Sequence, residues 1–155
     1  MAETLSLIRW RIALVIWMVL IFLVSSGLLS GSMSADSTEE FFGDLNYVVR
    51  KLAHLFEYAV LVFLWLRALL KDGKDFENRL RWGFLLSVVY AVTDEVHQSF
   101  VPNRLGTWTD VVYDAVGATI AAFVLRRTWA SGGEEIQRRL FGPLAPKGPS
   151  QPNPD

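Results

Sequence analysis

The feature that most constrains the fold is a run of eighteen consecutive uncharged residues from Ile12 to Leu29. An α-helix rises about 1.5 Å per residue, so this run covers about 27 Å, close to the thickness of a bilayer hydrocarbon core. The run is also longer than the roughly 7–15 apolar residues of a signal peptide, which favours a retained helix over a cleaved leader. The chain is therefore expected to be anchored in a membrane.

Three further apolar segments follow, beginning near residues 52, 82 and 108, and each carries a few charged residues. None of them shows the strict alternation of apolar and polar residues that is typical of a half-buried strand. The sequence therefore predicts an all-α integral membrane protein, a four-helix transmembrane bundle. The four helices are expected over about 10–30, 47–70, 81–100 and 108–127.

Residues 1–130 are predicted to form the transmembrane domain, and residues 131–155 a cytoplasmic extension. The extension has a short amphipathic stretch, followed by a tail that holds five of the six prolines and is predicted to be disordered. The segment 31–49, which is rich in acidic residues, is expected to form an outer loop. With both termini in the cytoplasm, twelve of the fifteen Lys and Arg residues lie inside, as the positive-inside rule requires.

Composition excludes several classes of protein. The chain has no cysteine, which removes disulfides, thiolate nucleophiles and cysteine zinc sites. The formal net charge of -1 argues against nucleic acid as a partner, because no global basic field would attract phosphates. The partner that the sequence does predict is the lipid bilayer.

Acidic residues recur at one depth within the predicted membrane segments. Helical rise places Glu57, Asp94 and Asp114 roughly 18–21 Å from the cytoplasmic edge, in the outer half of the membrane. A carboxylate at that depth costs several kcal/mol unless it is paired or hydrated. Agreement between three helices therefore indicates a functional site.

The helical period places the polar residues of each segment on one face. Gly117 and Ala121 continue the face of the fourth helix, and such small residues let neighbouring helices approach closely. We expect a polar pocket that opens to the outside, lined by the second, third and fourth helices, with Arg104 as a cationic lid. The candidate ligand-binding residues are Lys51, His54, Tyr58, Asp94, Glu95, Gln98, Arg104, Asp110 and Asp114.

The same residues also have purely structural interpretations. Asp94 is able to bond Gln98 as part of the helix packing. Glu95 is placed to pair with Arg104, and Asp110 to cap the fourth helix, where acidic residues are favoured. As a set, however, ionisable groups that cluster inside a membrane usually mark a site.

Two stretches, Lys51–Leu64 and Thr93–Ala118, resemble the signature blocks of the VanZ-like family. The first matches a K-x-x-H-x-x-E-Y helix; the second matches D-E-x-x-Q-x-F-x-P-x-R followed by a D-x-x-x-[N/D]-x-x-G helix. The resemblance covers about residues 10–127. It implies a small multipass protein of the bacterial cytoplasmic (inner) membrane, in a family whose named member is associated with resistance to the glycopeptide antibiotic teicoplanin.

The leading hypothesis is that the pocket binds a lipid-linked or cell-envelope ligand, with Lys51 and Arg104 holding an anionic head group. One alternative is a hydrolase or transferase, dependent on a metal or on acid–base chemistry, that acts on a phospholipid or peptidoglycan precursor. Two further alternatives are a proton-coupled transporter and a polar layer with a purely structural role. The sequence identifies no metal ligand, cofactor or oligomeric state. The candidate catalytic residues are His54, Glu57, Asp94, Asp110 and Asp114.

Overall fold

The computed structural model describes most of the predicted transmembrane domain. For residues 2–4 and 35–47 it describes the backbone alone. The predicted extension over 131–155 lies almost entirely outside the described residues, and so does Arg104. The described residues are 2–26, 35–70, 75–101, 106–131 and 140.

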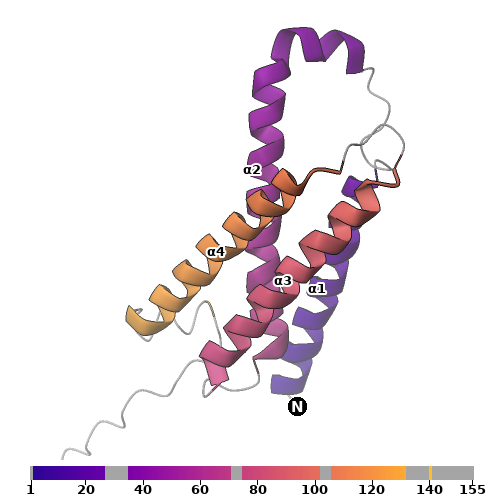
Figure 1. The fold of residues 1–155 in the computed structure, drawn as a ribbon. Coiled ribbons are helices and arrows are strands. Elements are labelled where there is room, and N and C mark those ends of the chain that lie inside the picture. The colour runs from indigo at the N-terminus through magenta and orange to yellow at the C-terminus, as the bar shows by residue number, and fades with distance from the viewer. Residues whose placement is uncertain (1, 27–34, 71–74, 102–105, 132–139, 141–155) are drawn as a thin grey trace, which may run out of the picture.

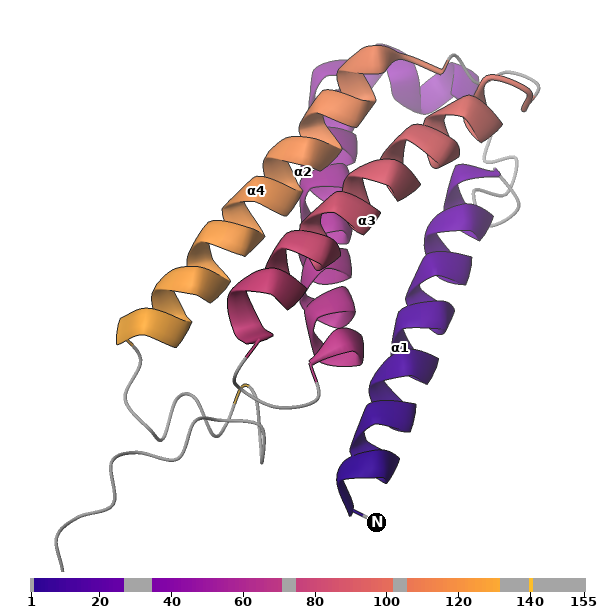
Figure 2. The same ribbon diagram turned by 60° about the horizontal axis from the view of Figure 1, so that its bottom comes forward.

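Four α-helices make up the described part of the chain, which contains no strand, so the predicted all-α class is confirmed (Figure 1). Consecutive helices run in opposite directions, which makes α2 and α4 parallel to each other (Figure 2). α2 contacts all three other helices, whereas α1 packs mainly against α2. The helices are α1 (Ala2–Ser25), α2 (Ala35–Leu69), α3 (Phe76–Gln98) and α4 (Trp108–Ser131).

The start of α2 differs from the prediction. The helix begins at Ala35 rather than near residue 47, so most of the outer loop predicted over 31–49 is helical. The prediction treated the acidic residues of this segment as a sign of a loop. The segment contains no proline, however, and Glu and Leu are strong helix formers. Among the residues of α2 whose side chains are described, Val48–Leu69 is long and apolar enough to cross a membrane.

Three helices are long and apolar enough to cross a membrane, over Leu5–Ser25, Val48–Leu69 and Trp108–Ser131. α3 has 23 residues and is therefore about 35 Å long, but charged residues lie in both its first and its last turns. Its Asp94 and Glu95 are buried within the bundle. α3 thus has the length of a membrane helix and turns these two acidic side chains inward.

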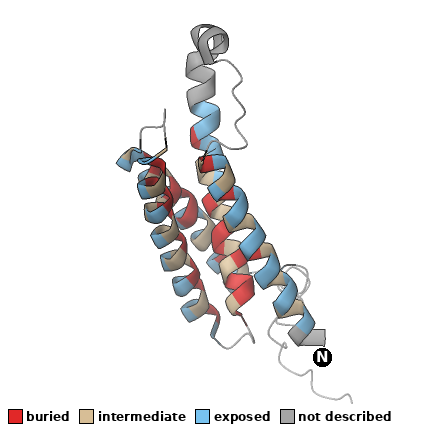
Figure 3. Ribbon diagram, turned by 90° about the vertical axis from the view of Figure 1, so that its right-hand side faces the viewer, coloured by how far each residue is buried: buried red, intermediate tan, exposed pale blue. Residues whose placement is uncertain are grey.

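The outer surface of the bundle is apolar, as a bilayer requires. Exposed residues line the outward faces of the helices, and buried residues face the neighbouring helices (Figure 3). On α4, for example, Val112, Val116 and Ile120 are exposed, while Asp110 and Asp114 are buried. This distribution is the reverse of that in a soluble helical bundle and supports a lipid environment.

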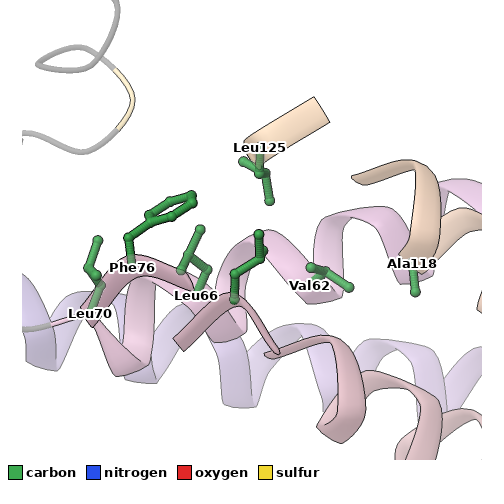
Figure 4. Close-up of a cluster of buried hydrophobic side chains, with 7 residues drawn as sticks. Val62, Leu66, Leu70, Phe76, Ala118 and Leu125 are labelled. Carbon is green, nitrogen blue, oxygen red and sulfur yellow. The ribbon is translucent and has the colours of Figure 1, made fainter. Parts of the chain in front are cut away.

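An apolar cluster fills the half of the bundle next to the α2–α3 connection (Figure 4). α2, α3 and α4 all contribute, and at its end the rings of Phe76 and Trp129 stack with centroids 4.2 Å apart. Apart from Arg67 and Ser87, the buried polar residues lie in the other half. The cluster consists of Val62, Leu66, Leu70, Phe76, Leu80, Ala118 and Leu125.

α2 and α4 approach each other most closely at Gly117. A Cβ atom at this position would lie 2.8 Å from Cα of Leu55, a backbone atom that is unable to move aside by changing rotamer. Gly83 of α3 has a looser fit, because a Cβ there would lie 3.2 Å from Cβ of Trp65. The glycine predicted to permit close helix packing therefore does so between α4 and α2.

We predict that Gly117→Ala lowers the thermal stability of the purified protein substantially, because the added methyl group forces α4 away from α2. Overpacking of this kind costs about 1–3 kcal/mol. The measurement is the unfolding temperature in detergent, followed by tryptophan fluorescence. Gly83→Ala is the matched control and should have a smaller effect. Equal effects of the two substitutions would contradict the proposed contact.

Candidate functional site

Two polar pairs connect α2 to α4. The Lys51 ammonium donates to the carboxylate of Asp110, and His54 Nδ1 lies 2.9 Å from Asp114 Oδ1. Lys51 and His54 are three residues apart, while Asp110 and Asp114 are four apart, so each set occupies one helix face. Because α2 and α4 are parallel, the two pairs follow one another along the same contact.

The side chains of these two pairs are stabilised in a buried position because each one bonds its partner on the other helix. Lys51, Asp110 and Asp114 are all buried, and the Lys51 ammonium also lies 4.9 Å from the centre of the Tyr113 ring. Asp110 occupies the first turn of α4, where the helix dipole favours a carboxylate. The exposed Arg50 adds a further cation, 3.9 Å from Asp110. The contact thus combines Coulomb attraction with hydrogen bonds.

A second set of polar contacts connects α3 to α1. The Asp94 carboxylate accepts a hydrogen bond from Ser25 Oγ at 2.6 Å and another from Gln98 Nε2 at 2.9 Å. His97 Nε2 lies 3.0 Å from Ser26 Oγ. Asp94 therefore has both a partner on its own helix, as anticipated, and one on α1.

The participation of α1 was missed by the sequence reasoning. The predicted pocket was assigned to the second, third and fourth helices, yet Ser25 bonds Asp94 directly. In addition, the Tyr90 hydroxyl donates to the backbone oxygen of Met18 at 2.7 Å. A signal was available, because Ser25 and Ser26 are the only hydroxyl side chains in the run from Ile12 to Leu29.

These groups form a polar layer at the α3–α4 end of the bundle. All of its members are buried except His54, which is partly exposed. Within the part of the chain whose side chains are described, no three His, Asp or Glu residues are grouped so that they could hold a metal ion. The metal-dependent form of the hydrolase alternative therefore stays a hypothesis from the sequence. The polar layer comprises Ser25, Lys51, His54, Tyr58, Asp94, Gln98, Asp110 and Asp114.

Glu95 points away from Asp94 and joins α3 to the start of α4. Its carboxylate accepts a hydrogen bond from the backbone N–H of Thr107. The predicted partner, Arg104, lies outside the described residues. The backbone bond explains how a carboxylate with only 7% exposure is stabilised at this end of the bundle.

Beside Glu95 is a pocket of about 190 Å³ between the end of α3 and the start of α4. Glu95 is the ionisable residue of its lining, and Trp108, 74% exposed, stands at its edge. This position differs from the predicted pocket, since its described lining residues come from α3, from the start of α4 and from the segment between them. The lining residues are Val92, Glu95, Val96, Ser99, Gly106 and Trp108.

A comparison with protein-family sequence models identifies the family of the chain. The sequence model of the VanZ/LLP1 family matches residues 10–129, a range that includes every residue of the polar layer and of the pocket. The chain therefore belongs to the VanZ/LLP1 family, and the predicted resemblance is confirmed. No curated protein and no solved structure matched the chain. The family and the three apolar helices together define a multipass membrane protein.

We predict that Asp110→Asn destabilises the protein by about 1.5–3 kcal/mol, because the buried Lys51 ammonium loses the negative charge of a carboxylate that it bonds. The double variant Lys51→Met/Asp110→Leu should be closer to the wild type, since both charges of this pair are then removed together. Unfolding temperatures in detergent test both expectations. A double variant less stable than Asp110→Asn would show that the pair is not the stabilising unit.

Proposed function

We propose that this protein binds the head group of a lipid-linked cell-envelope component at the outer side of the bacterial cytoplasmic membrane, with both of its own termini in the cytoplasm. The observation that carries the proposal is the pocket beside Glu95. A buried carboxylate lines it, and its edge is formed by exposed apolar side chains. An amphiphile in the bilayer is able to reach such a site by lateral diffusion, with its chain in lipid and its head group in the pocket.

The chemistry of the pocket indicates the kind of head group. Glu95 is acceptor-only when ionised, so it favours a hydroxyl or ammonium group, and Ser99 is able to donate or accept a hydrogen bond. A volume of about 190 Å³ is smaller than typical sites for whole small molecules, which run from about 300 Å³ upward. The pocket therefore suits part of a head group, with the rest of the ligand lying along the surface.

The sequence reasoning assigned an anionic head group to Lys51 and Arg104. In the structure the Lys51 ammonium bonds Asp110 within the polar layer, and Lys51 does not line the pocket. Arg104, two residues before Gly106 in the chain, stays a candidate for a phosphate on the same ligand. The proposed ligand thus has a hydrogen-bond donor for Glu95 and, as a lipid-linked compound, a phosphate close to the lipid.

The hydrolase and transporter alternatives depend on the candidate catalytic residues His54, Glu57, Asp94, Asp110 and Asp114. Glu57 is partly exposed, and the side chains of the other four bond one another or neighbouring side chains inside the bundle. The binding proposal needs no reacting group among them, and it assigns the polar layer the role of holding α3 and α4 in position around the pocket. We therefore favour binding.

We predict that Glu95→Gln weakens binding of a polyprenyl-diphosphate-linked muropeptide with a free amine by about tenfold or more, because a charge-assisted hydrogen bond is lost. The amide oxygen of Gln is still able to accept from Thr107, so the fold is retained. Binding is measured by native mass spectrometry in nanodiscs. Glu77→Gln, at the other end of the bundle beside Arg126, is the control and should bind like the wild type. Equal binding by Glu95→Gln would refute the assignment of the pocket.

We also predict that expression of the chain in a susceptible bacterium raises resistance to teicoplanin, and that Asp94→Asn or Arg104→Ala removes this effect. Asn at position 94 loses the charge that Ser25 and Gln98 both hydrogen-bond. The measurement is the minimal inhibitory concentration, with membrane levels of each variant checked by immunoblot. Full resistance in both variants at normal membrane levels would exclude a role for this end of the bundle.

A further inference from the structure

The Tyr58 hydroxyl is a buried polar group within the polar layer that the contacts described so far do not explain. Tyr58 is 0% exposed and lies on α2, one turn beyond His54 on the same face. Its hydroxyl has no hydrogen-bond partner among the described residues. Buried polar groups are almost always hydrogen-bonded, because an unsatisfied one keeps the full penalty of losing water.

The surroundings of this hydroxyl are polar rather than apolar. On α2, Tyr58 follows His54 by one turn, and His54 bonds the Asp114 carboxylate of α4. The Tyr58 ring lies 6.5 Å from the ring of Tyr90, which precedes Asp94 by one turn on α3. Asp114 belongs to the α2–α4 contact through His54, and Asp94 belongs to the α3–α1 contact through Ser25. Tyr58 therefore stands between the two halves of the polar layer.

Both carboxylates have capacity for another hydrogen bond. A carboxylate offers about four lone-pair sites, and Asp94 receives one bond on each oxygen, from Ser25 and Gln98. The Tyr58 hydroxyl is able to donate one hydrogen bond and accept others. Three groups on three helices thus converge with unused hydrogen-bonding capacity. A molecule that bridges these three side chains must donate hydrogen bonds to the carboxylates and also form a hydrogen bond with the Tyr58 hydroxyl.

We propose that a single buried water molecule binds at the Tyr58 hydroxyl and bridges it to Asp94 and Asp114. A partner from the bulk or from lipid is excluded by size, because Tyr58 is sealed from the surface. Water is small enough, and a buried water typically makes about three hydrogen bonds, which is the number of groups present. This site is separate from the Glu95 pocket and does not depend on the proposed ligand.

Such a water connects the two halves of the polar layer. Hydrogen bonds then run from the His54–Asp114 pair, through the water and Tyr58, to Asp94 and Ser25. All four helices are joined by one network, which fixes their relative positions more tightly than the two separate contacts do.

Radiolytic hydroxyl-radical footprinting of the intact protein in detergent tests this site directly. Millisecond X-ray pulses generate radicals from bound water, and these modify adjacent side chains even where bulk solvent has no access. We expect Tyr58 to be modified several-fold more than Phe76, a buried aromatic residue of the apolar cluster. Modification of Tyr58 no greater than that of Phe76 would overturn the proposal.

Tyr58→Phe provides a second, independent measurement. If a water bridges the hydroxyl, its loss removes a satisfied hydrogen bond, and the unfolding temperature falls by about 2–4 °C. Tyr90→Phe, which loses the bond to Met18, calibrates the effect of one such bond. An unsatisfied hydroxyl behaves in the opposite way, because its removal stabilises the protein. An unchanged or higher unfolding temperature for Tyr58→Phe would therefore contradict the bound water.

Discussion

The contact between α2 and α4 is the constraint on which the rest of the site depends. Gly117 lets the two backbones meet at Leu55, and this spacing brings Asp110 and Asp114 within reach of Lys51 and His54. With a larger residue at position 117, the helices would separate and leave buried charges without partners. A residue without a side chain thus determines whether four charged or polar side chains are stabilised or exposed to hydrocarbon.

The same constraint explains how an acidic helix such as α3 is accommodated. In lipid the apolar side chains of the four helices gain nothing by facing one another, so packing and hydrogen bonds hold the bundle together. α3 carries Asp94 toward α1 and Glu95 toward the start of α4, and each carboxylate meets a donor there. The bundle therefore has an apolar surface, an apolar half and a polar layer. The pocket lies where α3 passes to α4, beside that layer.

Much of this arrangement is visible in the sequence. The uncharged run of α1, the charge-poor segments that follow and the absence of strand-like alternation predict a helical membrane bundle, and the family match agrees. The helical period also selects Lys51, His54, Asp110 and Asp114, all of which the structure brings together. Periodicity succeeds here because a helix has a fixed number of residues per turn, so the face of each residue follows from its position.

The sequence by itself determined the membrane class and the faces of the helices, because these follow from hydropathy and from helix geometry. Only the tertiary structure decided which helix covers each face. The pairing of Asp94 with Ser25 of α1, the bond from Thr107 to Glu95 and the pocket beside it depend on how helices distant in sequence pack. Neither helical period nor hydropathy contains that information, because both are properties of one segment at a time.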